Sequence, residues 1–179
     1  SITFVEQPVL TAFENTASGV KITWNKVAGA TGYRVYRKAD GASEWTYLTT
    51  TKNLFYPDYK VENGVTYTYA VRAVCDGWYS DYIRAGVSIV RLGNPELLEA
   101  AALSKGINVT WAAVDGATGY RVYRKTANPT WVLVGTVKGA RVSYIDTSAV
   151  AGVKYTYTVR ATNGSYISNY DAAGISCKK

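Results

Sequence analysis

Histidine is absent from this chain of 179 residues. Its absence excludes catalytic triads of the Ser-His-Asp and Cys-His kinds and zinc sites that rely on imidazole. The chain also contains no Cys-x-x-Cys, P-loop or Gly-x-Gly-x-x-Gly motif. Its acids are scattered through predicted turns, as at Asp40, Glu44, Asp76 and Asp81, whereas a glycosidase needs two carboxylates that flank a cleft. We therefore expect no catalysis, no metal site and no cofactor.

Cysteine and long apolar runs are also scarce. Cys75 and Cys177 are the only two cysteines, which is too few for a disulfide framework, and we expect them to be buried or incidental thiols. No run of 18 or more apolar residues is present, so no membrane-spanning helix and no membrane insertion are expected.

Positive charge exceeds negative charge, with a net charge of +7. Residues 1–92 hold ten Lys or Arg against eight Asp or Glu (10 − 8 = +2), and residues 93–179 hold ten against five (10 − 5 = +5). This excess favours contact with anionic polymers such as cell-wall polymers, acidic glycans or nucleic acid, although a solvated basic surface has the same composition. No Lys/Arg run is longer than two, and we do not expect a nucleic-acid partner.

An internal repeat is the dominant feature of the sequence. The ten residues Gly-Ala-Thr-Gly-Tyr-Arg-Val-Tyr-Arg-Lys occur at 29–38 and again at 116–125. They are typical of a turn that leads into a strand, with Tyr33, Val35 and Arg37 on one face and Arg34, Tyr36 and Lys38 on the other. The repeat indicates two domains, which we place at residues 1–92 and 93–179.

Each half contains about seven short segments with strand periodicity and intervening turns, which predicts an all-β antiparallel sandwich. The second half repeats the order of the first at an offset of 86 to 88 residues. We predict strands near 20–24, 45–50, 54–58, 64–73 and 82–90, and a turn at Asp76-Gly77. Residues 96–103 contain good helix formers, but their counterpart at 9–16 does not, and we interpret them as a strand followed by a loop.

The pattern resembles tandem fibronectin type III domains, in particular those repeated in bacterial extracellular and cell-surface proteins. The resemblance rests on features that occur in both halves, namely a proline before the first strand, a tryptophan on the second, the Gly-Tyr-Arg-Val-Tyr-Arg strand and a Gly-x-x-Tyr segment: Pro8, Pro95, Trp24, Trp111, Gly64-x-x-Tyr67 and Gly152-x-x-Tyr155. It implies two immunoglobulin-like sandwiches, each with one sheet of three strands and one of four and without an inter-sheet disulfide. It also implies that Tyr67 and Tyr155 are tyrosine corners, whose hydroxyls bond to nearby backbone.

Strand periodicity also predicts the two cores. The residues expected between the sheets are Trp24, Tyr33, Val35, Tyr67, Tyr69 and Val71 in the first half and Trp111, Tyr120, Val122, Tyr155, Tyr157 and Val159 in the second.

One candidate binding surface is the outer face of the larger sheet. The repeated strand should pair with the strand at 64–73, which places Arg34, Tyr36 and Lys38 beside Thr68, Ala70 and Arg72. The second half would place Arg121, Tyr123 and Lys125 beside Thr156, Thr158 and Arg160. Arginine stacked on tyrosine suits an anionic glycan, but cross-strand pairs of this kind also stabilise an exposed sheet without binding anything.

A second candidate is Trp78 with Tyr79, which follow Asp76-Gly77 in the loop before the last predicted strand. Exposed flat rings stack on the apolar faces of sugars. Trp45 and Trp131 occur at equivalent places in the two halves, which favours a packing role for them. The Arg-Gly-Asp tripeptide of animal relatives is absent.

From the sequence we predict a non-catalytic spacer or interaction module of a larger secreted or cell-surface protein. It would hold its flanking domains apart and contact protein or glycan partners. The alternative is a carbohydrate-binding or adhesion module that uses the loop aromatics and the Arg/Tyr face.

Overall fold

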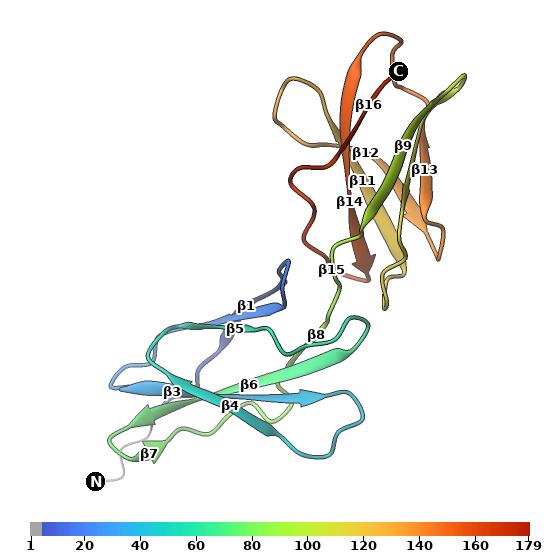
Figure 1. Ribbon diagram of the computed structural model, residues 1–179. Helices are drawn as coiled ribbons and strands as arrows, with labels where there is room; N and C mark the ends of the chain where they lie inside the picture. The colour runs from blue at the N-terminus through green and yellow to red at the C-terminus, as the bar shows by residue number, and fades with distance from the viewer. Residues whose placement is uncertain (1–4) are drawn as a thin grey trace. The chain divides into compact units, whose positions relative to one another are not determined.

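The computed structural model describes residues 5–179, and residues 1–4 of the first predicted domain lie outside the described part. The chain divides into two compact units between Arg91 and Leu92. All regular structure within the described residues is β-strand, as predicted (Figure 1). Each unit is a sandwich of two antiparallel sheets.

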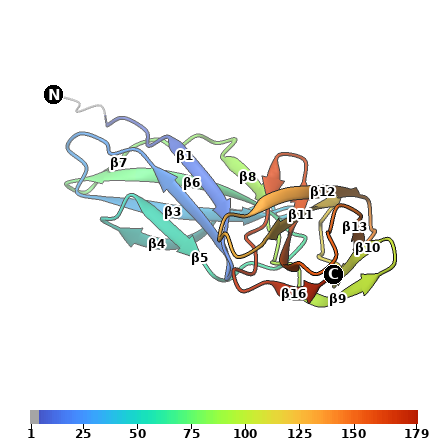
Figure 2. The same cartoon turned by 90° about the horizontal axis from the view of Figure 1, so that it is seen from above.

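Within its described residues, the first unit contains eight strands, of which β7 has only two residues. A three-stranded sheet has the order β1-β2-β5, and a larger sheet has the order β4-β3-β6-β7 with β8 also pairing with β6 (Figure 2). The strands are β1 Leu10–Asn15, β2 Val20–Trp24, β3 Gly32–Ala39, β4 Thr46–Thr51, β5 Phe55–Asp58, β6 Thr66–Cys75, β7 Trp78–Tyr79 and β8 Val87–Val90.

The second unit repeats this topology. Its smaller sheet has the order β13-β10-β9, and its larger sheet has the order β12-β11-β14-β15 with β16 also pairing with β14. The strands are β9 Leu97–Leu103, β10 Gly106–Trp111, β11 Gly119–Lys125, β12 Val132–Lys138, β13 Ser143–Asp146, β14 Lys154–Asn163, β15 Tyr166–Ile167 and β16 Ile175–Lys178. The segment with helix-forming residues, 96–103, is a strand as predicted, but the strand continues to Leu103 and the loop predicted after it within this segment is absent.

The larger sheet has five strands rather than the four expected, because the last strand is split in two. Residues 82–90 do not form one strand, since only Val87–Val90 pairs with β6. The backbone N–H of Ser80 donates to the carbonyl of Ala73 at 3.0 Å, and the Ser80 hydroxyl accepts the N–H of Ala73 at 2.9 Å. The serine side chain therefore satisfies a backbone donor that a continuous strand would have paired, and the chain can leave the sheet edge.

The predicted cores are confirmed in both units. All twelve predicted side chains are buried, and Trp24, Trp111, Tyr69, Tyr120 and Tyr157 are the largest of the fully buried ones. Trp111 and Tyr120 pack with ring centroids 5.3 Å apart, and Trp24 and Tyr33 with centroids 5.7 Å apart. Aromatic burial of this kind supplies a large share of the stabilisation of a small sandwich.

Two hydrogen-bonded features occur in both units, namely a tyrosine corner and a cationic side chain bound to the first hairpin turn. Tyr67 accepts the backbone N–H of Glu62 at 3.0 Å, and Tyr155 accepts that of Val150 at 3.1 Å, which confirms the two tyrosine corners. At the end of the first unit, Arg91 donates to the carbonyls of Thr16 and Gly19 in the turn between β1 and β2. Burial lowers the pKa of the Arg91 guanidinium.

At the equivalent place in the second unit, the ammonium of Lys179 donates to the carbonyls of Leu103 and Ser104 in the turn between β9 and β10. A cation therefore binds the first hairpin turn of each sandwich. No helix within the described residues is long and apolar enough to cross a membrane.

Candidate functional site

The outer face of the larger sheet has the predicted register in both units. In the first unit, Arg34 lies opposite Arg72, Tyr36 opposite Ala70 and Lys38 opposite Thr68. In the second unit, the repeated strand β11 places Arg121 opposite Arg160, Tyr123 opposite Thr158 and Lys125 opposite Thr156 on β14. Neighbouring cationic and aromatic side chains therefore share one face of each sheet.

Two arginines and a tyrosine form a stack on the first unit. The guanidinium carbon of Arg34 lies 4.3 Å from the ring centroid of Tyr79, and that of Arg72 lies 5.4 Å from the same ring. Arg72 is held in place because its Nε donates to the carbonyl of Ser80 at 2.7 Å. Arg72 also lies 5.6 Å from the ring centroid of Tyr82.

The other rings of this face pack against one another. Tyr36 and Tyr82 are stacked with centroids 6.5 Å apart and planes 25° apart. Trp45 meets Tyr82 edge-on at 6.0 Å, and Tyr47 meets Tyr36 edge-on at 5.8 Å. Tyr36 and Tyr82 are therefore part of one aromatic cluster and are half-buried.

The corresponding face of the second unit contains a depression. A surface pocket of about 200 Å³ is lined by Tyr123, Trp131, Thr158, Arg160 and Tyr170. Trp131 and Tyr170 meet edge-on at 6.1 Å. The guanidinium carbon of Arg160 lies 5.6 Å from the ring centroid of Tyr170, and its Nε donates to the carbonyl of Ser168 at 2.7 Å. Aromatic surface and a positioned cation thus meet at one depression.

Two predicted residues, Trp78 and Arg121, make no ring contact or side-chain hydrogen bond with these clusters in the described part of the chain. Trp78 and Tyr79 form the short strand β7, paired with Val74 and Cys75, and do not lie in a loop as predicted. The cause is the turn at Asp76-Gly77, where both residues have positive φ (43° and 87°) and make the two-residue hairpin that favours pairing. The Trp78 side chain is 77% exposed. Arg121 is also exposed, and within residues 5–179 it contacts no ring or carboxylate.

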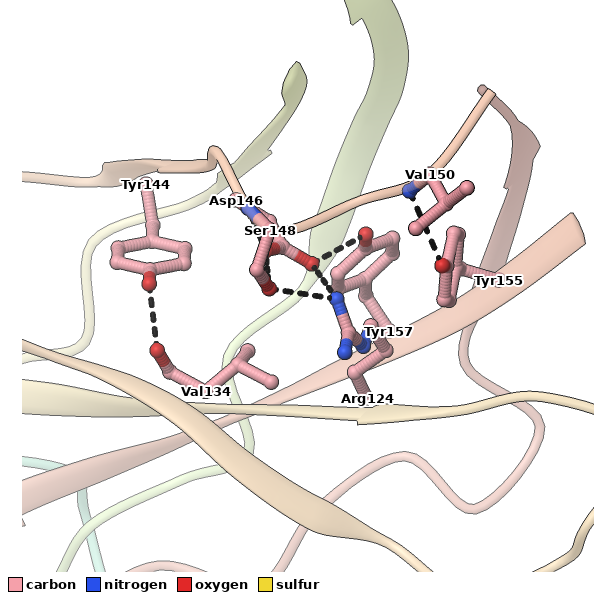
Figure 3. Close-up of polar contacts among 8 residues, drawn as sticks. All are labelled: Arg124, Val134, Tyr144, Asp146, Ser148, Val150, Tyr155 and Tyr157. Carbon is pink, nitrogen blue, oxygen red and sulfur yellow. Dashed lines mark hydrogen bonds and ion pairs between the residues drawn. The ribbon is translucent and has the colours of Figure 1, made fainter. Parts of the chain in front are cut away.

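A buried polar network inside each sandwich was not predicted. In the second unit, Arg124 on β11 pairs with the buried Asp146 at the end of β13 at 2.6 Å. The Tyr157 hydroxyl donates to the same carboxylate at 2.8 Å, and both the N–H and the hydroxyl of Ser148 donate to its other oxygen (Figure 3). The first unit repeats the pair as Arg37–Asp58 at 2.8 Å.

Titration of this network follows from its geometry. Burial by itself would raise the pKa of the Asp146 carboxyl, but hydrogen bonds from Ser148, Tyr157 and Arg124 outweigh it, and the pKa of Asp146 is lowered. Burial and the adjacent carboxylate raise the pKa of Tyr157. Every group is occupied by a neighbour, so the network is a structural connection between the sheets. The sequence carried a signal for it, since Asp58 and Asp146 occur at equivalent places and Arg37 and Arg124 share the inward face.

Within the part of the chain that the structure describes, no group of three or more His, Cys, Asp or Glu side chains could hold a metal ion. Cys75 and Cys177 are free thiols. The chemistry that these side chains offer is stacking, cation–π contact and charge-assisted hydrogen bonding at the outer faces.

The chain matches no family model. It is 31% identical over 180 aligned residues to exoglucanase B of Cellulomonas fimi, with 88% of this chain and 15% of that protein covered. It is 27% identical to chitinase A1 of Niallia circulans, with 84% of this chain and 22% of that protein covered. A poly(3-hydroxybutyrate) depolymerase of Ralstonia pickettii is 30% identical over 105 residues, with 58% of this chain and 20% of that protein covered. The chain spans about a fifth or less of each of these relatives.

Two solved structures resemble the chain. A segment of two fibronectin type III domains from chicken tenascin covers 97% of this chain and all of its own length, with 16% identity and a TM-score of 0.47. The FN1–FN3 domains of chicken CNTN1 cover 98% of this chain and 67% of their own length, with 16% identity and a TM-score of 0.44.

The strand order, the buried tryptophan and the tyrosine corner of each unit are those of the fibronectin type III sandwich. The protein is a tandem pair of such sandwiches. It is similar in sequence to segments of bacterial exoglucanase and chitinase.

Proposed function

We propose that this chain is a non-catalytic module of a larger secreted or cell-surface protein, in which it holds flanking domains apart. The observation that carries the proposal is the set of relatives. Their names denote action on a glucan, on chitin and on a polyester, while the shared segment is a small part of each. A segment common to enzymes for three different polymers is independent of the bond that each enzyme cleaves.

The side chains support this proposal. The buried carboxylates Asp58 and Asp146 are each paired with an arginine, so neither is free to act as the acid or the nucleophile of hydrolysis. The fold itself is one that hosts many unrelated functions, which come from sites placed on it.

The purified 179-residue chain should release no soluble product from cellulose, chitin or poly(3-hydroxybutyrate) above a buffer blank. A catalytic fragment of the parent protein, assayed on the same substrate, is the positive control. Product release by the 179-residue chain that is abolished in Asp146→Asn would contradict the proposal.

We propose polysaccharide contact as a second function, because aromatic and cationic side chains gather on the outer sheet faces. The residues that we assign to it are Trp78, Tyr79, Arg34, Tyr36, Arg72, Arg121, Tyr123 and Arg160. Calorimetric titration against soluble glycans and cell-wall polymers tests it. Saturable binding supports contact, and its weakening by Trp78→Ala would place the contact on the first unit. A chain that binds none of the ligands at millimolar concentration acts as a spacer only.

A further inference from the structure

The pocket of the second unit differs from the equivalent region of the first in the contacts of one tyrosine. Within residues 5–179, Tyr123 forms no hydrogen bond and no ring or cation contact, although it lines the pocket. Its counterpart Tyr36 stacks with Tyr82, with centroids 6.5 Å apart. Tyr170, the counterpart of Tyr82, meets Trp131 edge-on at 76°, much as Tyr82 meets Trp45 at 79°.

One difference in sequence between the units lies in the wall of the pocket. The strand Tyr-Thr-Tyr-Ala-Val-Arg-Ala of the first unit becomes Tyr-Thr-Tyr-Thr-Val-Arg-Ala in the second, with Thr158 in place of Ala70. The Thr158 hydroxyl donates to the carbonyl of Asp171 at 2.8 Å. This bond fixes the backbone next to Tyr170, and alanine at position 70 cannot form it.

The size and walls of the pocket restrict its occupant. Its volume of about 200 Å³ lies below the range of roughly 300–1,000 Å³ that is usual for drug-sized ligands, so it suits a single ring. Tyr123, Trp131 and Tyr170 supply flat apolar surface, and Thr158 and Arg160 supply the polar part of the wall. A six-membered sugar ring has this combination of an apolar face and a polar rim.

The charges around the pocket select among sugars. The ammonium of Lys125 lies 4.3 Å from the ring centroid of Trp131. Arg160 uses Nε for the carbonyl of Ser168, and within the described residues its two terminal nitrogens have no partner. None of the lining residues is acidic, and the Asp171 carboxylate accepts the N–H of Ala173. A guanidinium with free terminal N–H groups matches a carboxylate in a paired, charge-assisted geometry.

We infer that the pocket formed by Tyr123, Trp131, Thr158, Arg160 and Tyr170 binds a uronic acid residue of an acidic polysaccharide. The sugar ring stacks on the aromatic walls, and its carboxylate accepts hydrogen bonds from Arg160 with Lys125 nearby. The inference rests on the second function proposed above and names its ligand class and its unit. The net charge of +5 on residues 93–179, from ten Lys or Arg and five Asp or Glu (10 − 5), favours the same ligand.

The test is a titration of the isotopically labelled 179-residue chain with tetragalacturonate, followed by NMR. The indole N–H of Trp131 should shift saturably, with a Kd on the order of 1 mM for one sugar ring. Tyr123→Ala should weaken binding about tenfold or more, because stacking surface is lost. It should leave the melting temperature nearly unchanged, since Tyr123 has no partner in the described structure.

Arg160→Gln and Arg141→Gln form a matched pair, because each removes one positive charge from the second unit. Loss of the paired hydrogen bonds in Arg160→Gln should weaken binding about tenfold, whereas Arg141→Gln should change Kd by less than about twofold, since Arg141 is exposed and does not line the pocket. Equal weakening by the two variants would show general electrostatic attraction and overturn the inference.

Three further ligands separate the remaining outcomes. Cellotetraose or chitotetraose binding as tightly as tetragalacturonate would overturn the assignment of an acidic sugar while leaving glycan contact intact. Tetraglutamate binding equally well would overturn the assignment of a sugar. Absence of binding by every ligand would overturn both this inference and the glycan function, and leave the spacer function standing.

Discussion

Asp146 is the residue on which the interior of the second sandwich most depends. Its buried carboxylate accepts hydrogen bonds from Arg124, Tyr157 and Ser148, and so joins the two sheets. A buried ion pair contributes little net stability, but removal of one partner leaves the other charge uncompensated. The same residue type at the same place in the first unit, Asp58, accepts from Arg37 and Tyr69.

Replacement of Asp146 by Asn should therefore lower the free energy of unfolding of the second unit by about 3 kcal/mol. The measurement is urea denaturation, with Asp115→Asn as the control because Asp115 is exposed. Exposed substitutions of this kind change stability by less than about 0.5 kcal/mol. An equal effect of the two substitutions would contradict the role of the network.

The lowered pKa of Asp146 also predicts a dependence on pH. The carboxyl has a lower pKa folded than unfolded, and the unfolded value is about 3.9. Its contribution is thus fully present above about pH 4 and is lost as pH falls through the folded pKa. The stability difference between the parent chain and Asp146→Asn should be constant near neutral pH and shrink below about pH 4. A constant difference down to pH 2 would show that the carboxylate is not the source.

At the scale of the element, the strand that is identical in both halves does not have identical surroundings. In the second unit, β11 begins its pairing with β12 at Gly119, opposite Lys138. In the first unit, the pairing of β3 with β4 begins one position later, at Tyr33 opposite Thr51. A Cβ at Gly119 would lie 2.7 Å from the carbonyl oxygen of Val137, whereas one at Gly32 would have an ordinary contact of 3.4 Å with that of Thr51.

Replacement of the first glycine of the strand by alanine should therefore be tolerated in β3, at Gly32, but not in β11, at Gly119. We expect Gly119→Ala to destabilise the second unit by about 1–3 kcal/mol, because the backbone of β12 must move. Gly32→Ala should change the stability of the first unit by less than about 1 kcal/mol. Urea denaturation of the two variants is the measurement, and each serves as the control for the other. A larger loss for Gly32→Ala would contradict the difference in pairing.

At the scale of the whole molecule, each unit has a core of its own. The second core gathers around Trp111, Tyr120, Tyr155 and Tyr157, and the predicted core of the first lies around Trp24. The two tryptophans also share one detail, since neither indole N–H has a hydrogen-bond partner among the described residues.

Removal of one tryptophan should consequently unfold one unit. Trp111→Ala deletes the largest side chain of the second core and should cost about 3–5 kcal/mol, which is a large part of the roughly 5–15 kcal/mol that stabilises a typical domain. NMR spectra in increasing urea should show signals of the second unit disappearing first, while those of the first unit keep their original midpoint. Simultaneous loss of both sets of signals would show that the two cores unfold as one.

The alternation of residue types determined most of the fold. Strand period two places Tyr33 and Val35 inside and Arg34 and Tyr36 outside, and the observed pairing of these strands matches the predicted register. The repeat carried the same register into the second unit. The split of the last strand was not predictable from periodicity, because it depends on Ser80 bonding to Ala73 across the sheet edge.

Only the tertiary structure decided what differs between the two copies. Ten identical residues form β3 and β11 with the turn before each, yet the ring of Tyr36 stacks with Tyr82, whereas Tyr123 contacts no other ring among the described residues. The side chains that face these tyrosines come from distant parts of the chain, and they differ: Thr158, opposite Tyr123, bonds to Asp171, whereas Ala70, opposite Tyr36, has no hydroxyl. Local sequence sets which face of a strand a side chain occupies, whereas contacts between distant segments set what covers it.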